Sequence, residues 1–460
     1  MDKIHFIGIG GTGLSAIARV LLEDGIQVSG SDLTNSELTA ALAELGAKIR
    51  IGHSPENLGD AELVVRSSAV PDENVEVQAA REAGIPVLKR ADFLPLLTEG
   101  KQVIAVAGSH GKTTTTSMIA WIFTALDQDP SFIVGSLVEN LRTNARAGQG
   151  ASFVIEADEY DGMFLGLEPD LGVITNVEHD HPDIYPTEDD FFGVFRQYLA
   201  GFKTGAELIY CADDAGANRL VEEIREDLKQ IRYGIEAENL DYRAENLQIN
   251  SRGGTDFEAV ILEEEGKKRY LISLQVPGKH NVLNALAAFA VANRSRLSRK
   301  WSARALTDYK GSSRRFDVRG TFQGITLIDD YGHHPTEIKS SLAAARNAYP
   351  ERKLLAVWQP HTYSRTQTLL EEFAVCFEDA DQVMMLDVYP ARETKPEGFS
   401  PEEVVNKIEH PQIRFTPEIE AAVDYLQEAL EEGDVLIVFT AGDAIKITDQ
   451  LEQKFKVEEI

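Results

Sequence analysis

The sequence is poor in cysteine, in basic residues and in long hydrophobic runs. Its 460 residues include two cysteines, Cys211 and Cys376, too few for a disulfide framework or a thiolate metal site. We expect both to be ordinary buried thiols in a reducing compartment. No hydrophobic run approaches the roughly 20 residues that a membrane-spanning helix needs. Residues 1–6 lack the features of a signal peptide, so we predict a cytoplasmic protein.

Acidic residues greatly outnumber basic ones. The chain has 75 Asp and Glu against 45 Lys and Arg, a formal net charge of −30. Nucleic acids and anionic membranes need a basic patch on their partner, so this composition argues against both. Anionic small molecules are not excluded, because a local group of backbone N–H donors, Lys, Arg and metal is enough to bind them. We therefore expect small-molecule partners.

The order of strands and helices predicts three consecutive α/β domains. Residues 1–98 start with strand, glycine turn, helix and strand, the pattern of a Rossmann-like domain with a parallel sheet. Residues 99–313 start again with an apolar strand at 103–107 and a helix at 114–126, a P-loop ATPase-like arrangement. Residues 239–272 alternate apolar and polar, which predicts an added antiparallel β-meander with turns at Gly253-Gly254 and Glu265-Gly266.

Residues 314–460 predict a second Rossmann-like domain. Apolar strands are expected at 326–329, 354–358, 382–386 and 435–439. Helices are expected between them, at 337–348, 365–377, 401–407 and 419–431. The predicted fold class is therefore α/β throughout.

A glycine-rich loop follows the first strand of the second domain. It runs Gly108-Ser109-His110-Gly111-Lys112-Thr113, with Thr114 beginning the helix. The glycines let successive N–H groups face a polyphosphate, and the helix N-terminus adds partial positive charge. Lys112 can reach the β- and γ-phosphates of ATP, and the Thr113 hydroxyl can bind Mg²⁺. The loop is shorter than GxxxxGK[ST], and the alternative is a glycine turn with an exposed lysine.

Two acidic runs with histidines follow later strands of this domain, Glu156–Asp161 and Asn176–His181. Ligands of open α/β sheets bind at the carboxyl ends of the strands, where both runs emerge. A hard cation takes carboxylate oxygens and tolerates an imidazole. The runs are therefore candidate Mg²⁺ ligands, although either one alone is more often a solvated loop.

A second glycine motif opens the first domain. Gly8, Gly10, Gly11, Thr12 and Gly13 form GxGxxG between strand and helix, and Asp32 lies 19 residues beyond Gly13. The loop can bind a pyrophosphate and the acid a ribose hydroxyl. A UDP-sugar and a nicotinamide dinucleotide both carry these groups, so the motif predicts a diphosphate nucleotide without deciding which. A nicotinamide-dependent oxidoreductase would use this motif but would leave residues 108–115 without a function. The motif could also be a purely structural glycine turn.

With these motifs in this order, the chain resembles the Mur ligase family across essentially its whole length. Ten ordered blocks over three domains carry the resemblance, and no single one would be specific. They are residues 5–15 (HFIGIGGTGLS), 29–32 (SGSD), 67–70 (SSAV), 107–115 (AGSHGKTTT), 156–161 (EADEYD), 175–183 (TNVEHDHPD), 277–285 (PGKHNVLNA), 314–317 (RRFD), 329–337 (DDYGHHPTE) and 359–366 (QPHTYSRT).

The resemblance implies roles for individual residues in nucleotide and metal binding. Lys112 and Thr113 resemble the family's ATP-phosphate and Mg²⁺ residues, and Glu156 and His181 match its metal ligands. The implied ATP and substrate cleft also includes residues from later blocks: the catalytic candidate His280, with Asn281, Asn284, Arg315 and Asp330. Of these, Arg315 resembles the arginine that approaches the phosphates from the third domain, and Asp330 the acid that contacts the ribose. Ser68, Ala69 and Asn144 are assigned with the glycine motif to the UDP-sugar site.

The amino-acid side of the implied site contains four residues, His333, His334, His361 and Arg365. Arg365 is the best candidate to pair with the carboxylate of the incoming amino acid. Without the resemblance, ordinary structural roles fit several of the assigned residues equally well. His280-Asn281 could be a helix cap, Asn284 a surface amide, Arg314-Arg315 a solvated pair and His333-His334 a plain turn.

The resemblance implies an ATP- and Mg²⁺-dependent ligase that joins L-alanine to UDP-N-acetylmuramate in peptidoglycan precursor synthesis. ATP would convert the sugar carboxylate to an acyl phosphate, which the amine then attacks. The amine must lose a proton, and His333, His334 or His361 could accept it. We expect the chain to act as a monomer or a weak homodimer.

Two departures keep other substrates open. Tyr160 stands where many alanine-adding members have Ser, and a tyrosine also occurs there in the related ligase that recycles a tripeptide. Thr362 stands where many members have Arg. Residues 192–199 offer no lysine, whereas sister ligases carry a carbamoylated lysine. The missing lysine favours the alanine-adding branch of the family. The tripeptide-recycling ligase and a non-catalytic UDP-sugar-binding protein remain as alternatives.

Overall fold

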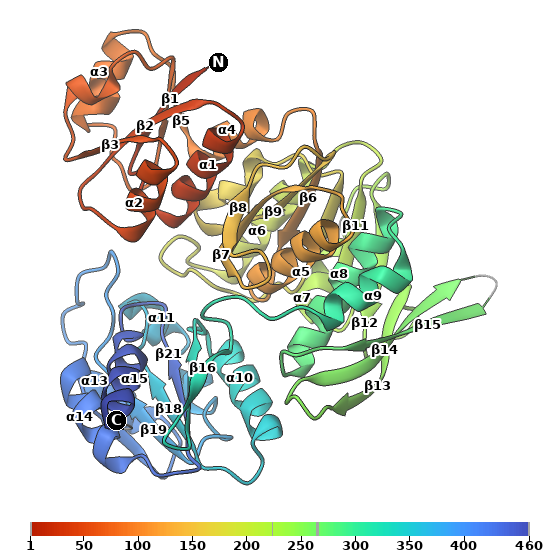
Figure 1. Ribbon diagram of the computed structural model, residues 1–460, viewed down its shortest axis with the longest axis vertical. Coiled ribbons are helices and arrows are strands. Elements are labelled where there is room, and N and C mark those ends of the chain that lie inside the picture. The colour runs from red at the N-terminus through yellow and green to blue at the C-terminus, as the bar shows by residue number, and fades with distance from the viewer. Residues whose placement is uncertain (1, 223, 264–265, 459–460) are drawn as a thin grey trace.

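A computed structural model describes residues 2–222, 224–263 and 266–458 (Figure 1). These residues form three sheets, one in each predicted α/β domain, so the predicted fold class is confirmed. The boundaries at 98/99 and 313/314 stay predictions, and Glu265 of the predicted turn lies outside the described residues. No helix in the described part of the chain is both long and apolar enough to cross a bilayer.

The N-terminal domain has a parallel sheet of five strands in the order β3-β2-β1-β4-β5. The strands are β1 (Lys3–Ile7), β2 (Gln27–Asp32), β3 (Lys48–Ile51), β4 (Leu63–Arg66) and β5 (Val87–Lys89), with α1 (Thr12–Glu23), α2 (Glu37–Glu44), η1 (Pro55–Leu58), α3 (Val75–Glu82) and α4 (Arg90–Leu97) between them. The strand order reverses between β1 and β4, where such sheets bind nucleotides. β1 ends at Ile7, because Gly8 turns the chain with φ +82°.

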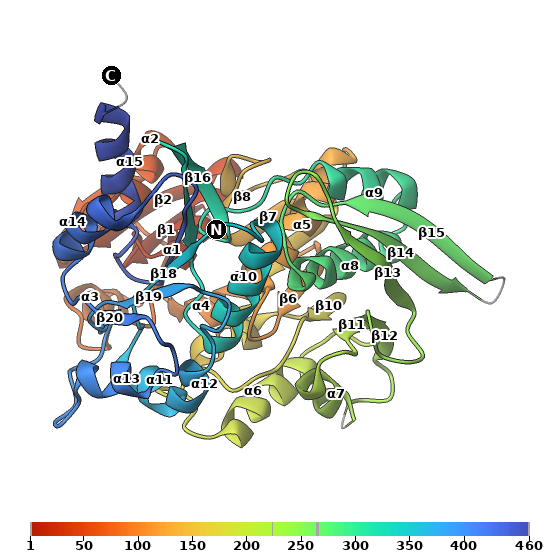
Figure 2. The same cartoon turned by 90° about the horizontal axis from the view of Figure 1, so that it is seen from below.

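The central domain has a ten-stranded sheet in the order β15-β14-β13-β12-β11-β10-β6-β9-β7-β8. Its strands are β6 (Gln102–Ala107), β7 (Ser131–Val138), β8 (Thr143–Arg146), β9 (Ser152–Glu156), β10 (Leu171–Ile174), β11 (Glu207–Cys211), β12 (Lys229–Gly234), β13 (Tyr242–Ile249), β14 (Thr255–Glu263) and β15 (Gly266–Ser273). The predicted meander is confirmed as β13–β15, which pair antiparallel and project away from the other two domains in Figure 2.

Helices cover both faces of the central sheet. They are α5 (Lys112–Ala125), η2 (Tyr160–Gly166), α6 (Glu188–Ala200), α7 (Ala215–Val221), α8 (Lys279–Arg294) and α9 (Arg299–Thr307). One hydrophobic cluster joins α5, α8 and α9 to one face. A second cluster runs from the other face into the N-terminal domain, where α4 packs on η2 and α1 on β7 and β8. The first two domains therefore share a core.

The C-terminal domain has six strands in the order β16-β17-β21-β18-β19-β20. They are β16 (Asp317–Phe322), β17 (Ile325–Asp330), β18 (Leu354–Trp358), β19 (Gln382–Met385), β20 (Ile413–Phe415) and β21 (Val435–Phe439), and β16 alone is antiparallel to its neighbour among these described strands. The helices are α10 (Pro335–Ala348), α11 (Tyr363–Thr368), α12 (Leu370–Ala374), α13 (Pro401–Lys407), α14 (Ile419–Ala429) and α15 (Lys446–Glu458).

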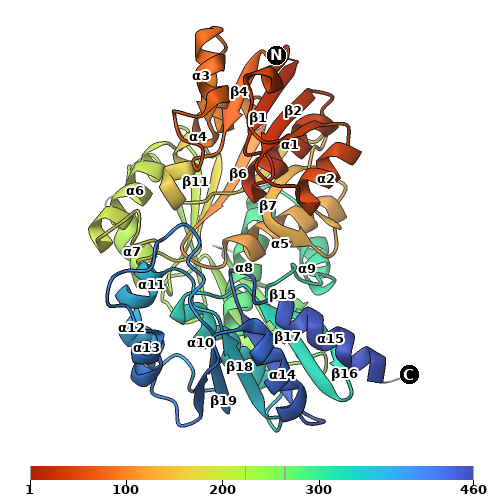
Figure 3. The same ribbon diagram turned by 90° about the vertical axis from the view of Figure 1, so that its left-hand side faces the viewer.

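The single helix predicted at 365–377 is wrong. Leu369 leaves helical geometry at φ −104° and ψ 24°, and its buried side chain packs into the core, which splits the segment into α11 and α12. The two hydrophobic clusters of this domain contain only its own residues. Figure 3 shows the N- and C-terminal domains at opposite ends of the view, and Figure 1 shows both of them on one side of the central domain. The C-terminal domain therefore meets the central one mainly through polar contacts.

Candidate active site

The glycine-rich loop of the central domain connects β6 to α5, as the sequence predicts. Gly108 has φ +136° and Gly111 φ +79°, conformations that side chains rarely adopt. A Cβ on Gly108 would collide with the hydroxyl of Thr175, and one on Gly111 would lie 2.6 Å from Oδ1 of Asn284. Both glycines are therefore required by close neighbours as well as by the backbone turn.

Lys112 folds back over this loop. Its Nζ donates to the carbonyls of Gly108 (2.6 Å) and Ser109 (3.0 Å) and lies 2.8 Å from the carboxylate of Glu159. Burial tends to lower the pKa of Lys112, but Glu159 and Asp158 raise it above its usual value. The ammonium is thus charged, and its three hydrogens face the two carbonyls and the Glu159 carboxylate.

The predicted metal ligands lie along one cavity of about 360 Å³. Thr113 donates its hydroxyl hydrogen to Oε1 of Glu156 at 2.9 Å, and the N–H of Gly135 donates to Oε2 at 2.7 Å. Burial raises the pKa of Glu156. His181 instead faces Glu159, with Nε2 3.2 Å from Oε1. The hydroxyl, the buried carboxylates and the imidazole form an oxygen-rich donor set that fits Mg²⁺.

A second cavity, of about 270 Å³, lies between the loop, the start of α8 and α10. His280, Asn281, Asn284, Arg315 and Asp330 all line it. Asn284 accepts a hydrogen bond from Thr115 at 3.2 Å, which ties α8 to the phosphate-loop helix. Burial lowers the pKa of His280 to about 4 and raises that of Asp330 to about 6. The carboxylate of Asp330 accepts from Gly332 (2.6 Å) and Ser341 (2.9 Å).

His110 of the loop links the central domain to the C-terminal domain. Its Nε2 lies 3.0 Å from Oε2 of Glu178, and its Nδ1 lies 3.3 Å from Oε1 of Glu337. Thr336 also donates to Glu178, at 2.9 Å. Burial lowers the pKa of His110, but the two carboxylates raise it, to about 10 overall. The imidazole is therefore protonated and forms an ionic bridge across the domain interface.

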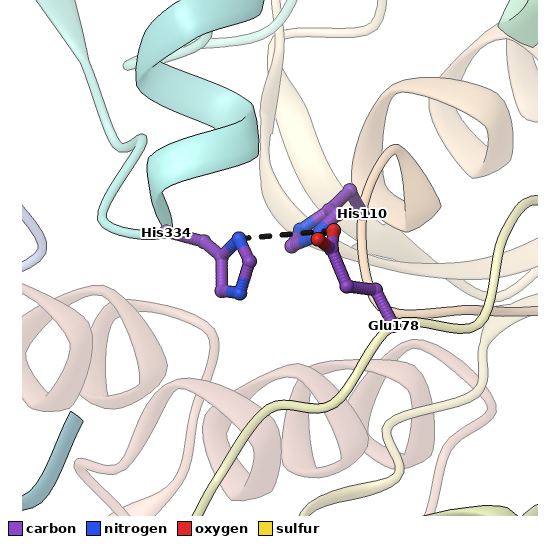
Figure 4. A group of neighbouring side chains, drawn as sticks. All are labelled: His110, Glu178 and His334. Atoms are coloured by element: carbon purple, nitrogen blue, oxygen red, sulfur yellow. Dashed lines mark hydrogen bonds and ion pairs between the residues drawn. The ribbon is translucent and has the colours of Figure 1, made fainter. Parts of the chain in front are cut away.

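Figure 4 shows how His334, at the start of α10, faces His110 and Glu178. One donor atom from each lies within 4.8 Å of the other two, a separation that a metal ion could bridge. Both nitrogens of His110 already face carboxylates, however, and Nδ1 of His334 accepts from the N–H of Thr336 at 3.3 Å. The three side chains are therefore better described as an interdomain contact around the protonated His110 imidazole than as a metal site.

Arg315 reaches the phosphate loop from the C-terminal domain, as the resemblance implies. One of its terminal nitrogens lies 3.4 Å from the hydroxyl of Thr113, and the other lies 3.6 Å from Glu337. The guanidinium also sits over the ring of Tyr331, 4.9 Å from its centroid. This places a C-terminal cation directly beside the predicted phosphate and metal site.

Arg365 is already paired in this structure. Its Nε donates to Oδ1 of Asp180 at 2.9 Å, and a terminal nitrogen lies 2.8 Å from the same oxygen. The remaining donors face Nδ1 of His361 (3.1 Å) and Nδ1 of His181 (3.3 Å). Only 3% of Arg365 is exposed. The guanidinium predicted to hold the substrate carboxylate therefore forms a buried interdomain ion pair.

The three candidate bases differ in position. His333 and His361 line the larger cavity, with ring centroids 5.6 Å apart, whereas His334 lines neither cavity. Burial and the neighbouring Arg365 lower the pKa of His361 to about 4 and that of His333 well below its usual value. Burial and the charge of His110 lower the pKa of His334 to about 4. All three rings are neutral near pH 7.

The glycine motif of the N-terminal domain lies at the carboxyl end of β1. The N–H of Gly10 donates to Oδ2 of Asp32 at 2.8 Å, so this acid supports the loop. Gly8 packs against Ser67, so the segment that follows β4 lies beside the glycine motif. This segment contains the exposed residues Ser68 and Ala69. Gly11, Thr12 and Gly13 open α1, and Asn144 lies on β8, which α1 contacts.

Four carboxylates of the site were given no individual role from the sequence: Glu159, Glu178, Asp180 and Glu337. The first three lie in the two acidic runs that were predicted as candidate Mg²⁺ ligands. All of them fall inside the ten blocks that carry the resemblance. Their positions in those blocks could have marked them as candidate site residues. Their hydrogen-bond and ion-pair partners could not be predicted, because these come from elements far apart in the chain.

Comparisons with known proteins agree with the three-domain organisation. The family model described as "Mur ligase family, catalytic domain" matches residues 3–102, "Mur ligase middle domain" matches 106–292, and "Mur ligase, glutamate ligase domain" matches 314–442. Together these matches span most of the chain.

Curated relatives match over nearly the full length. A protein named UDP-N-acetylmuramate–L-alanine ligase from Roseiflexus castenholzii is 42% identical, with 96% of this chain and 95% of the relative covered. One of the same name from Geotalea daltonii is 41% identical, with 99% and 98% covered. The crystal structure of UDP-N-acetylmuramate-alanine ligase MurC from Thermotoga maritima is 28% identical, with a TM-score of 0.80 and full coverage of both chains.

Proposed function

The chain belongs to the Mur ligase family, and we propose that it joins L-alanine to UDP-N-acetylmuramate with cleavage of ATP to ADP and phosphate. Relatives that bear this activity in their names share about 40% identity over the whole chain. The observation that carries the proposal is the larger cavity, where Lys112 and Thr113 of the phosphate loop meet Arg315, His361 and Arg365 of the C-terminal domain.

The reaction needs an activated carboxylate, because a free carboxylate is a poor electrophile. The γ-phosphoryl group of ATP passes to a carboxylate oxygen of UDP-N-acetylmuramate, giving an acyl phosphate and ADP. Lys112 and Arg315 lie beside the glycine loop and neutralise charge on the phosphates during this transfer. Mg²⁺ held by Thr113, Glu156 and His181 would supply further charge neutralisation when bound.

The amine of L-alanine then attacks the acyl carbon, and phosphate leaves. The attacking nitrogen must give up a proton, and His333 and His361 are neutral rings in the same cavity that could accept it. Bound phosphates would raise their pKa values towards neutrality, because nearby negative charge favours imidazolium. The interdomain contacts of His110 and Arg365 keep water away from the acyl phosphate.

The N-terminal domain would hold the UDP-sugar. Its glycine loop can take the pyrophosphate at the start of α1, with Asp32 fixing the loop through Gly10. Ser68, Ala69 and Asn144 would complete this site. Because the N-terminal and central domains share a core, the sugar carboxylate can be presented to the phosphate loop from a fixed direction.

The function can be tested by phosphate release with UDP-N-acetylmuramate, ATP, Mg²⁺ and a panel of amino acids. L-Alanine should support turnover, and the tripeptide L-alanyl-γ-D-glutamyl-meso-diaminopimelate should not. Release with the tripeptide alone would assign the chain to the recycling reaction instead. Release that no amino component stimulates would refute a ligase.

Lys112→Ala tests the phosphate site. We expect it to abolish phosphate release while leaving UDP-sugar binding intact, because Lys112 contacts only the central domain. The same change at Lys407, exposed on α13, is the control and should have no effect. Near-normal turnover by Lys112→Ala would contradict the assignment.

A further inference from the structure

The larger cavity contains four Lys and Arg side chains, and three of them already have carboxylate partners. Lys112 pairs with Glu159, Arg315 with Glu337 and Arg365 with Asp180. The fourth is Arg392, from the loop that follows β19. Within the described part of the chain, no carboxylate lies within ion-pair distance of Arg392. A cation of this kind is free to bind an anionic group of a substrate.

Arg392 is held at the cavity by the aromatic ring of Tyr160. A terminal nitrogen of its guanidinium donates to the Tyr160 hydroxyl at 3.2 Å, and its central carbon lies 5.3 Å from the ring centroid. The same hydroxyl donates to Asp183 at 3.1 Å, and the ring meets His181 edge-on at 5.1 Å. The guanidinium is thus oriented by one neutral partner, and its other N–H groups remain for a ligand.

The backbone that carries Arg392 is fixed to the segment that carries Arg365. Thr362 donates its N–H to the carbonyl of Tyr389 at 2.9 Å, and Tyr389 donates to Pro360 at 2.8 Å. The carboxylate of Glu393 accepts the N–H groups at the start of α11, from Tyr363 at 2.6 Å. Glu393 is therefore occupied by the helix, although it is the sequence neighbour of Arg392.

Arg365 is a poor choice for the substrate carboxylate in this arrangement. Its donors are used by Asp180, His361 and His181, and removal of the guanidinium from Asp180 would leave a buried carboxylate without its arginine partner. Arg392 is exposed and could turn to a ligand without such a cost. The two arginines therefore have different roles, one in the interdomain contact and one towards the substrate.

A series of contacts along the cavity wall connects Lys112 at one end of the cavity with Arg392 at the other. Lys112 contacts Glu159, Glu159 contacts His181, and His181 contacts Tyr160, which holds Arg392. The acyl phosphate must form at the Lys112 end, so the attacking amine points there. The carboxylate of the same amino acid then points towards the end where Arg392 lies.

We propose that Arg392 is a specificity-determining residue that pairs with the α-carboxylate of the incoming amino acid. This rests on the proposed function, in which the nucleophile is a free amino acid. The chemistry recognised is an α-amine with a carboxylate on the adjacent carbon. A guanidinium suits this group because its planar fork can donate two parallel hydrogen bonds.

The test is steady-state kinetics of Arg392→Met, which keeps side-chain bulk and removes the charge. The KM for L-alanine should rise roughly 10- to 100-fold, as expected for loss of a hydrogen-bonded charge pair. The kcat and the KM values for ATP and UDP-N-acetylmuramate should change little. Arg392→Lys should be intermediate, because it keeps the charge without the fork. Lys395→Met, an exposed change on the same loop, is the control and should match the wild type.

L-Alaninamide gives a second readout, because it lacks the carboxylate. Wild-type enzyme should prefer L-alanine, and Arg392→Met should lose most of that preference in kcat/KM. The proposal is overturned if the KM for L-alanine is unchanged, if the amide is impaired by the same factor, or if the KM for UDP-N-acetylmuramate rises instead. Absence of amino-acid-stimulated phosphate release in the wild type would instead overturn the proposed function.

Discussion

The buried ion pair between Asp180 and Arg365 predicts how the C-terminal domain is held closed. Each side chain is only 4% exposed, and the two belong to different domains. Burial alone would raise the pKa of Asp180, but the Arg365 guanidinium holds it well below its usual range. The substitution Asp180→Asn removes the charge and keeps an oxygen for the N–H of His181, which now donates to Oδ1 at 2.7 Å.

The magnitude follows from the guanidinium left behind. A buried charge that loses its partner costs about 3–5 kcal/mol. The closed form can escape this cost by opening, because opening exposes Arg365 to water and breaks no hydrophobic core of the C-terminal domain. The closed-to-open ratio should therefore fall by roughly two to three and a half powers of ten. The thermal stability of the separate domains should change little.

The shift from the closed to the open form can be measured by small-angle X-ray scattering with bound nucleotides. We expect Asp180→Asn to keep a larger radius of gyration and a lower kcat than the wild type. Asp381→Asn is the matched control, because Asp381 pairs with Arg346 inside the C-terminal domain. The double variant Asp180→Asn with Arg365→Met removes both charges and should become compact again. Wild-type compaction and kcat in Asp180→Asn alone would refute the reasoning.

Two further substitutions or conditions give measurable effects. Gly108→Ala should weaken ATP binding by about 10- to 100-fold in calorimetry, because φ is +136° and the added methyl would collide with Thr175. The control is Gly205→Ala, which lies at φ +75° with open space around it and should bind ATP normally. Equal ATP binding by the two variants would contradict this prediction. Acid should destabilise the fold through His334, whose pKa of about 4 lies below the unfolded value of about 6.5. The unfolded chain then binds the extra proton, so stability present above pH 6.5 is lost as pH falls towards 4, by about 2 kcal/mol at pH 5. Chemical denaturation of the wild type and His334→Gln at pH 8 and pH 5 should show a smaller pH effect in the variant, and an equal effect would exclude His334 as the cause.

Local sequence was enough to predict the phosphate loop. An apolar strand, two glycines and a threonine-rich helix start occupy consecutive positions, so Lys112 and Thr113 could be placed without knowledge of the rest of the chain. The meander was predictable for the same reason, because alternation along one strand reports which face is buried. The interruption at Leu369 was not, because the helical spacing of apolar residues continues across it.

The partners of the site cations could not be predicted from local sequence. Glu178 and Glu337 stand on either side of His110, but one follows β10 and the other lies on α10. Which oxygen meets which nitrogen is decided by how two domains approach each other. Arg392 belongs to no motif and lies in an irregular loop, so only its position beside Tyr160 reveals it.

The internal ion pairs also constrain how ATP can bind. Lys112 must leave Glu159 to contact a phosphate, and Glu159 is fully buried. Without compensation, that carboxylate would lose its main cationic partner at a cost of several kcal/mol, and the His181 imidazole would remain beside it. A divalent cation held by Thr113, Glu156 and His181 would offset this loss, because it would bring positive charge to the acidic run at 156–161. The exchange of partners at Glu159 would therefore couple metal binding to nucleotide binding.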